Sequence, residues 1–314
     1  MTYQRDGRIA RITLDRPERG NGITLEMPRE LAACVERANL DPEVHVLALA
    51  GNGSGFCGGY DLVAAAEGRG IDRSGADPAA PGGGAKDAAG IGSGSPLDPS
   101  VIARNHDPDG TWDPVVDFQM MSRNVRGFMS LFWSEKPVVC KVHGYCVAGG
   151  TDMALCSDLL VVAEDAKIGY PPARVWGVPT TALWVHRLGP ARAKRLLLTG
   201  DSLTGRQAVS WGLATDWAPA DEVDRVFEEL LERVARIPVN QLVMHKLQAN
   251  QAILSAGLLQ TQALSTLMDG IARHTPEGYA WQRRAAEAGF KQAVRERDEP
   301  FGDFGLGGSA PGAQ

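Results

Sequence analysis

Apolar and polar residues alternate with two different periods along the N-terminal part of the chain. Residues 8–14 (RIARITL) alternate with period two and residues 44–50 (VHVLALA) form a short apolar run, so both segments predict buried strands. Between them, residues 25–38 place apolar side chains at helical spacing, and Thr24 is placed to cap this helix. A strand, a helix and a strand in this order predict a parallel sheet and an α/β fold.

The same patterns continue through the rest of the chain. Residues 137–142 predict another buried strand, and His143–Gly144 predicts a turn after it. Helical spacing is present in five further segments: residues 117–133, 151–160, 180–198, 202–211 and 223–237. From residue 238 to residue 297 only helices are predicted, separated at Gly270 and at residues 275–278, and we expect them to form a separate layer.

Two segments lack such patterns. Residues 67–100 are dominated by Gly, Ala, Pro, Asp and Ser, which leaves too little apolar surface to offset the entropy of ordering. We therefore expect a flexible, Gly/Pro/Ala-rich insertion at about residues 67–112. It is either a surface loop or a lid over a substrate, and we favour the surface loop. Residues 301–314 are Gly-rich and predict a disordered tail.

Composition limits the classes of protein to which the chain can belong. Its 314 residues are enough for one elaborated α/β domain. No apolar run approaches membrane-spanning length, and residues 1–14 contain no signal-peptide core, so we expect a cytoplasmic protein with no membrane partner. The net charge of −6 argues against nucleic acid as a partner.

The five cysteines predict neither a disulfide framework nor a metal site. Their number is odd, and no C-x-x-C pair or His-rich spacing points to zinc. In a cytoplasmic chain we expect them to be reduced, small and buried. Cys57 lies in a glycine-rich loop and would be a candidate nucleophile. No histidine lies near it in the sequence, so packing is the favoured interpretation.

Paired glycines follow two of the predicted strands. Gly149–Gly150 opens a helical segment, and Gly58–Gly59 follows the strand at residues 44–50. A glycine pair at a helix N-terminus permits close approach of another group and leaves N–H groups and the positive end of the helix dipole pointing at it. Two such junctions can supply the two N–H donors of an oxyanion hole, with Asp152 in the first turn beside one of them. Tight strand–helix packing is the alternative explanation for each pair alone.

Four stretches resemble the crotonase (enoyl-CoA hydratase/isomerase) superfamily, in the family's order. They are ITLDRPERGNGIT (12–24), FCGGYDL (56–62), HGYCVAGGTDMALCSDLLVVAEDAKIGYPPARVWGVP (143–179) and LTGDSLTGRQAVSWGLAT (198–215). The resemblance implies a core of repeated ββα units in a superhelix over residues 1–235, and an all-helical C-terminal layer over residues 236–300 that serves trimer contacts. It also implies an acyl-CoA thioester as the substrate, and a homotrimer or a dimer of trimers.

The resemblance also assigns roles to single positions. The backbone N–H groups of Tyr60 and Gly149 would form the oxyanion hole for a thioester enolate. The Tyr60 side chain is expected to point away from the thioester oxygen and is a candidate for closing the pocket. Coenzyme A enters as part of the substrate, with no covalently bound cofactor, and its contacts would be Arg19, Gly59, Tyr60, Asp61, Leu62 and Gly149. Arg19 is alternatively a solvated surface charge.

The acid–base residues depart from the family pattern. A hydratase of this family uses two Glu carboxylates, because water addition needs a base for the water and an acid for the α-carbon. Here the first position is Asp152 and the second is Pro172, which cannot transfer a proton. Asp152 alone can still move a proton between two carbons, as an isomerase does. Tyr170 is a further candidate, although a packed aromatic side chain is the more common role.

Several functions therefore stay open. The main expectation is an enzyme of the enoyl-CoA hydratase/isomerase type in fatty-acid or related acyl-CoA metabolism. Decarboxylation or hydrolysis with Asp152 as the sole carboxylate, and acyl-CoA binding without turnover, are the alternatives, and the intact glycine pairs favour an enzyme. A Rossmann-type dehydrogenase is disfavoured, because no G-x-G-x-x-G follows the first strand.

Overall fold

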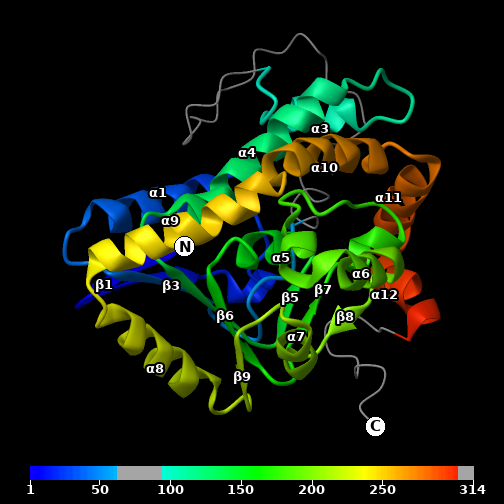
Figure 1. The fold of residues 1–314 in the computed structure, drawn as a ribbon. Helices are drawn as coiled ribbons and strands as arrows, with labels where there is room; N and C mark the ends of the chain where they lie inside the picture. The colour runs from blue at the N-terminus through cyan, green and yellow to red at the C-terminus, as the bar shows by residue number, and fades with distance from the viewer. Residues whose placement is uncertain (62–93, 303–314) are drawn as a thin grey trace.

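The computed structural model describes residues 1–61 and 94–302, and its centre is a six-stranded sheet (Figure 1). The strand order is β1-β2-β3-β4-β6-β9, in which β1 pairs antiparallel with β2 and every other neighbouring pair is parallel. The bounds are β1 Thr2–Asp6, β2 Ile9–Leu14, β3 Val46–Gly51, β4 Val138–Val142, β6 Leu159–Ala163 and β9 Asp216–Ala218. The predicted parallel sheet is confirmed, with one antiparallel strand at its edge.

A second sheet gives the fold its repeat. It contains β5 (Tyr145–Val147), β7 (Lys167–Gly169) and β8 (Ser202–Leu203). The large-sheet strands β4 and β6 are followed by the small-sheet strands β5 and β7, respectively. β5 leads to α5 (Gly149–Ala154), and β7 leads through a 3-10 turn, η2 (Pro171–Arg174), to α6. This strand–strand–helix succession is the ββα unit that the resemblance implied.

Helices flank the large sheet, with α8 on one side and α1, α4, α9 and α10 on the other (Figure 1). The helices, apart from α5, span α1 Met27–Leu40, α3 Pro99–Asn105, α4 Pro114–Trp133, α6 Leu183–Thr199, α7 Gly205–Trp211, α8 Val223–Ala235, α9 Val239–Ser255, α10 Leu258–Arg273, α11 Pro276–Ala288 and α12 Phe290–Asp298, with short 3-10 turns η1 Pro17–Arg19 and η3 Glu299–Phe301. Within residues 1–61 and 94–302, no helix combines the length and the apolar character that a membrane span needs.

One predicted helix is wrong in its second half. Helical spacing predicted a helix over residues 151–160, but α5 ends at Ala154 and Leu159–Ala163 is strand β6. This run, LLVVA, is apolar and partly β-branched, and it pairs with β4 from Val139↔Leu159 to Val142↔Val162. A short apolar run fits either element by its spacing, and here the neighbouring strand decides.

Two predicted boundaries also need correction. Gly270 was predicted to separate two helices, but it lies inside α10. The boundary between α9 and α10 is instead at Gly257, which has φ +88°. The expected flexible insertion at 67–112 falls partly outside the described residues. Its described end, 94–112, contains helix α3, which Asp98 caps by accepting a hydrogen bond from the Ser100 N–H at 2.9 Å.

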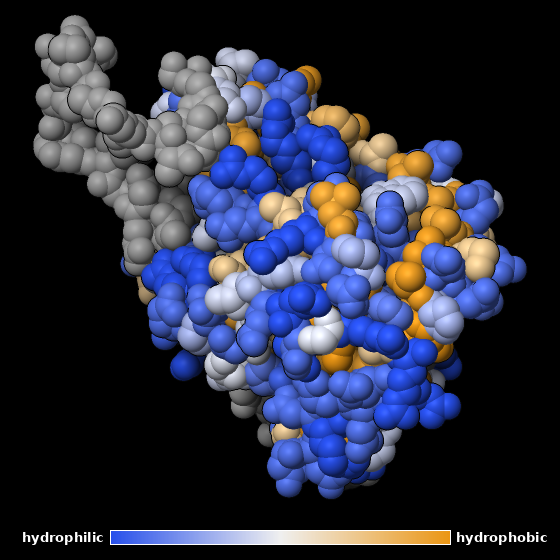
Figure 2. Space-filling model, turned by 90° about the vertical axis from the view of Figure 1, so that its left-hand side faces the viewer, coloured by the Kyte–Doolittle hydropathy of each residue, from blue (hydrophilic) through white to orange (hydrophobic). Residues whose placement is uncertain are grey.

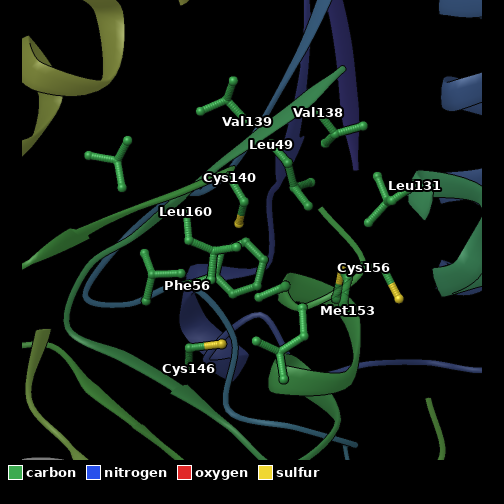
Figure 3. Packing of buried hydrophobic residues seen from close by; sticks show 14 of the residues in the cluster. Leu49, Phe56, Leu131, Val138, Val139, Cys140, Cys146, Met153, Cys156 and Leu160 are labelled. Atoms are coloured by element: carbon green, nitrogen blue, oxygen red, sulfur yellow. The ribbon is translucent and has the colours of Figure 1, made fainter. Parts of the chain in front are cut away.

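The core packs the two sheets against α5 and α4 (Figure 3). Leu49, Phe56, Leu131, Met153 and Leu160 are fully or almost fully buried in it. Full burial of one such side chain contributes about 1.5–3 kcal/mol. Four of the five cysteines are buried, namely Cys57, Cys140, Cys146 and Cys156, and all five are free thiols, as expected.

The close packing of α4 on α1 generates a test. A Cβ added at Gly127 would lie 2.5 Å from the carbonyl oxygen of Pro28. This oxygen belongs to the backbone of the first turn of α1, so it cannot move aside as a flexible side chain can. Gly127→Ala should therefore destabilise the fold by about 1–3 kcal/mol, although alanine is the better helix former. Urea unfolding measures this change. Arg126→Ala, at the exposed neighbouring position, is the control and should unfold as the wild type does.

Candidate active site

A cavity of about 900 Å³ lies beside the β5–α5 junction, enclosed by η2 and by helices α3, α4, α10, α11 and α12. Most of its wall is apolar, and the large side chains on it are Ile102, Met120, Met121, Pro171, Pro172, Trp176, Trp281 and Phe290. Trp281 contacts both Trp176 and Phe290, with ring centroids 5.3 and 5.8 Å apart. The polar side chains on the wall include Tyr60, Asn124, Tyr170, Asp269 and Arg273.

The first glycine junction leaves one backbone amide outside its bridge to Ile23. Tyr60 forms a parallel bridge with Ile23, in which Ile23 N–H donates to the Gly59 oxygen at 2.9 Å and Asp61 N–H donates to the Ile23 oxygen at 3.0 Å. A parallel bridge of this pattern uses the groups on one side of the strand only. The Tyr60 N–H therefore points to the opposite side, away from Ile23.

The second junction meets the first. Gly149 is the first residue of α5, so its N–H belongs to the first turn, whose amides have no partner inside the helix. A Cβ added at Gly59 would lie 3.6 Å from the Gly149 nitrogen, and one added at Gly150 would lie 2.5 Å from the Cys57 oxygen. Only glycine permits this contact, because a side chain at Gly150 would collide with the Cys57 oxygen. Gly59 in addition has φ +96°, a conformation that other residues rarely adopt. The predicted convergence of two glycine junctions is thus present in the fold.

The Tyr60 ring lies over Gly149. A Cβ added at Gly149 would be 2.8 Å from Cε2 of Tyr60, and the ring is part of the cavity wall. The side chain therefore lies beside the second junction and helps to close the cavity. Its hydroxyl is buried near the Asn124 side chain, and burial raises its pKa well above the usual value.

Asp152 is buried just behind the wall of the cavity. Its Oδ1 accepts hydrogen bonds from the backbone N–H and the hydroxyl of Thr181, at 3.0 and 2.8 Å. Its Oδ2 is buried and has no partner in the part of the chain that the structure describes. Burial raises the pKa of this carboxyl to about 7, against the hydrogen bonds from Thr181, and the charge of Asp269 adds to the rise.

Asp269, which the sequence analysis missed, supplies a second buried carboxylate. It lies on α10 and forms part of the cavity wall. Its Oδ1 accepts from the Val178 N–H at 3.3 Å, and its Oδ2 lies 3.3 Å from Nη2 of Arg273, one helical turn later. Burial raises the pKa of Asp269 as well. The signal in the sequence was an Asp–Arg pair four residues apart on an otherwise uncharged helix.

Some of the remaining predicted site residues line the cavity and others do not. Tyr170 and Pro172 are both part of its wall, and burial raises the Tyr170 pKa well above its usual value. Asp61 also reaches the wall, but its carboxylate is held by Arg16 at 3.0 Å and by Arg19 at 3.1 Å. Arg19 is not part of the wall itself. Leu62 lies outside the described residues.

Cys57 is a packing residue. It is fully buried, its thiol donates to the Asn21 oxygen at 3.2 Å, and burial raises its pKa to about 12. A thiol with such a pKa is a poor nucleophile at neutral pH. The favoured interpretation of the sequence therefore agrees with the structure.

One group of side chains beside the cavity has the composition of a metal site: His106, Asp117 and His274. Their polar atoms are already engaged, because His274 faces the Gly270 and Asn105 carbonyl oxygens at 2.8 and 3.0 Å. Asp117 accepts from the Trp112 indole at 2.7 Å, and Arg273 brings a positive charge 3.2 Å from its other oxygen. This donor set fits a hydrogen-bonded network that joins α3, α4 and α10 better than a cation site.

The fold and the paired glycine junctions define a class, the crotonase-type enzymes that act on acyl-CoA thioesters. A family model described as enoyl-CoA hydratase/isomerase matches residues 4–78 and 117–279, more than half of the chain. The chain therefore belongs to the enoyl-CoA hydratase/isomerase family, and the predicted fold and enzyme class are confirmed.

Individual relatives agree with this assignment. A solved structure of an enoyl-CoA hydratase from Mycobacterium smegmatis is 52% identical, with a TM-score of 0.87, and the match covers 98% of this chain and 95% of that one. EchA13 of Mycobacterium tuberculosis, which carries the name of an enoyl-CoA hydratase, is 31% identical over 254 residues, 80% of this chain and 73% of that protein. The 1,2-epoxyphenylacetyl-CoA isomerase of Escherichia coli K12 is 29% identical over 269 residues, 83% of each chain.

Burial of Asp152 predicts a pH-dependent stability. Its folded pKa of about 7 exceeds the usual 3.8, so the native state binds more protons than the unfolded state between these values, and stability falls as pH rises through that window. Asp152→Asn, which carries no charge, should raise the melting temperature at pH 8 by about 2 °C or more. Scanning calorimetry at pH 8 and pH 5 tests this. A variant whose advantage over wild type does not shrink toward pH 5 would contradict the assignment.

Proposed function

We propose that the protein forms the enolate of an acyl-CoA thioester, with the N–H groups of Tyr60 and Gly149 on the thioester oxygen and Asp152 moving the proton. The observation that carries the proposal is the meeting of two glycine junctions beside a buried carboxyl whose pKa is raised to about 7. Two fixed donors stabilise the enolate relative to the neutral thioester, and loss of one costs about 2.7–4 kcal/mol of barrier in related holes.

The raised pKa of Asp152 suits proton transfer in both directions. A general base works best when its pKa lies near the working pH, because it is then deprotonated often enough and still basic enough. In double-bond isomerisation, Asp152 would take a proton from C2 of a 3-enoyl thioester. The same carboxyl would return a proton at C4, so that a 2-enoyl thioester results and the carboxylate is regenerated.

Coenzyme A would lie along the first junction. Tyr60 and Asp61 are part of the cavity wall at this junction, and Arg19 is held beside them by its ion pair with Asp61. This placement supports Arg19 as a positive charge near the anionic end of coenzyme A. Metabolism of fatty acids or related acyl-CoA esters in the cytoplasm is the setting that such a substrate and the sequence composition support.

The cavity supports an acyl group larger than a crotonyl chain. Its volume of about 900 Å³ and its apolar wall leave room beyond C4, and the ring cluster of Trp176, Trp281 and Phe290 offers flat surfaces to a long or ring-bearing group.

We further propose a homotrimer or a dimer of trimers whose contacts involve the C-terminal helices. α9 and α10 expose large apolar side chains, namely Met244, Leu247, Leu259, Leu264, Leu267, Met268 and Ile271. Figure 2 shows orange apolar residues grouped between polar ones on one side of the molecule. Contiguous apolar surface of this kind usually marks an interface.

Enzymatic turnover is tested with Asp152→Asn. The variant should lose isomerisation of 3-enoyl-CoA by about 10²–10⁴-fold in kcat, because the amide cannot transfer the proton. Its affinity for an unreactive acyl-CoA thioester should stay within about threefold. Assays over a series from C4 to ring-bearing thioesters measure both activity and acyl preference. Asp165→Asn, at an exposed carboxylate, is the matched control. Full activity of Asp152→Asn would reject Asp152 as the proton-transfer group.

The assembly is tested by light scattering. The wild type should show three or six times the chain mass of 33.5 kDa. Leu264→Glu on α10 should shift the protein toward smaller species, because a charge would enter the apolar contact. Leu198→Glu, at the exposed end of α6, should leave the mass unchanged. A monomeric wild type would contradict the proposed trimer.

A further inference from the structure

We propose that Asp269 is the second proton-transferring group of this site and that it replaces the carboxylate lost at Pro172, so that the enzyme can hydrate enoyl-CoA thioesters. This inference rests on the proposed function of the cavity, in which Asp152 serves the enolate. It adds what Asp152 alone cannot supply, since water addition needs one group for the water and one for C2.

The position of Asp269 follows from a single backbone segment. The chain leaves η2 at Arg174 and enters α6 at Leu183. Within this connection the Val178 N–H donates to Asp269 and the Thr181 N–H donates to Asp152. The two carboxylates are thereby held by amides three residues apart, on the segment that directly follows Pro172.

Helix α10 holds Asp269 rigidly. Nε2 of Gln262 donates to the Thr181 carbonyl at 2.9 Å, which ties α10 to the same segment. At Gly270, a Cβ would lie 3.0 Å from Cβ of Asp117, so α10 and α4 approach closely beside Asp269. A general acid or base needs such fixed placement, because proton transfer depends on short, aligned contacts.

The charges around Asp269 leave it able to exchange a proton. Burial raises the pKa of Asp269, and the positive charge of Arg273 acts against this rise. The Arg273 guanidinium also pairs with Asp117, 3.2 Å away, so two carboxylates share its charge. The other groups that face this position are Asp152, Tyr60 and Tyr170, of which the tyrosines are neutral at pH 7. Two buried carboxyl groups in one site disfavour double ionisation, so one holds a proton while the other is free to accept one.

With two carboxyl groups, every proton of the hydration reaction has a donor and an acceptor. The ionised carboxylate takes a proton from water as the water oxygen bonds to C3 of the 2-enoyl thioester. The electrons of the C2=C3 bond move to the thioester oxygen, where the Tyr60 and Gly149 amides stabilise the enolate. C2 next takes the proton of the protonated carboxyl, and the product is a 3-hydroxyacyl thioester. The pair ends with its one proton on the other carboxyl and is reset by exchange with solvent.

The experiment separates water addition from enolate formation. Asp269→Asn keeps the shape of the side chain but cannot transfer a proton, and Asp269→Glu restores a carboxyl one methylene further out. Thr266→Val, one turn earlier and buried on the same helix, is the matched structural control. Two rates are measured for each variant with thioesters from C4 to ring-bearing groups: hydration, and exchange of C2–H of the saturated thioester in D₂O.

Asp269→Asn should lose hydration by about 10²–10⁴-fold in kcat with KM within about threefold, while C2–H exchange stays within about tenfold of wild type. Asp269→Glu should recover part of the lost rate, and Thr266→Val should behave as the wild type in both assays. The pH dependence of hydration should lose one titrating group in Asp269→Asn.

Four results would overturn the proposal. Hydration by Asp269→Asn within threefold of wild type, or a wild type that exchanges C2–H but hydrates no thioester, would remove Asp269 from the reaction and leave the proposed function intact. Equal loss of hydration and exchange, with no recovery in Asp269→Glu, would make the residue structural only. A wild type without either activity on the whole series would reject the proposed function together with this inference.

Discussion

The close contact between the two glycine junctions is the constraint on which the rest of the structure depends. The Val147 N–H donates to the Cys57 oxygen at 3.1 Å, and Gly59 and Gly150 leave no room for a side chain between the two turns. This contact joins the end of the large sheet to the start of α5, and in the proposed function the Tyr60 and Gly149 amides beside it bind the thioester oxygen. An oxyanion hole made of backbone needs this rigidity, because donors that must first reorganise stabilise a developing charge poorly.

Two buried carboxyl groups lie close to the cavity and lower the stability of the fold at neutral pH. Asp152 and Asp269 both have raised pKa values, because burial penalises their charged forms. Each is held by one or two hydrogen bonds from the connection between η2 and α6, which fix its position without fully compensating its charge. Such groups lower the stability of the fold at neutral pH and are therefore typical of sites that transfer protons.

The C-terminal helices do more than cover the core. α10 places Asp269 and Arg273 on the cavity wall, and α11 and α12 add Trp281 and Phe290. The network around Asp117 joins α10, which carries Asp269, to α3 and α4, which contribute to the same cavity wall. The helical layer therefore shapes the cavity as well as covering the core.

The sequence alone determined the α/β class, both glycine junctions and Asp152, because period-two apolar runs and paired glycines are local patterns with direct structural meaning. It could not decide whether the LLVVA run before Glu164 is helix or strand, since only pairing with β4 settles that. Asp269 and the Tyr60 ring over Gly149 were decided by tertiary structure. Asp269 lies more than a hundred residues from Asp152 in the sequence, and no local pattern records which helix face the fold turns toward a cavity.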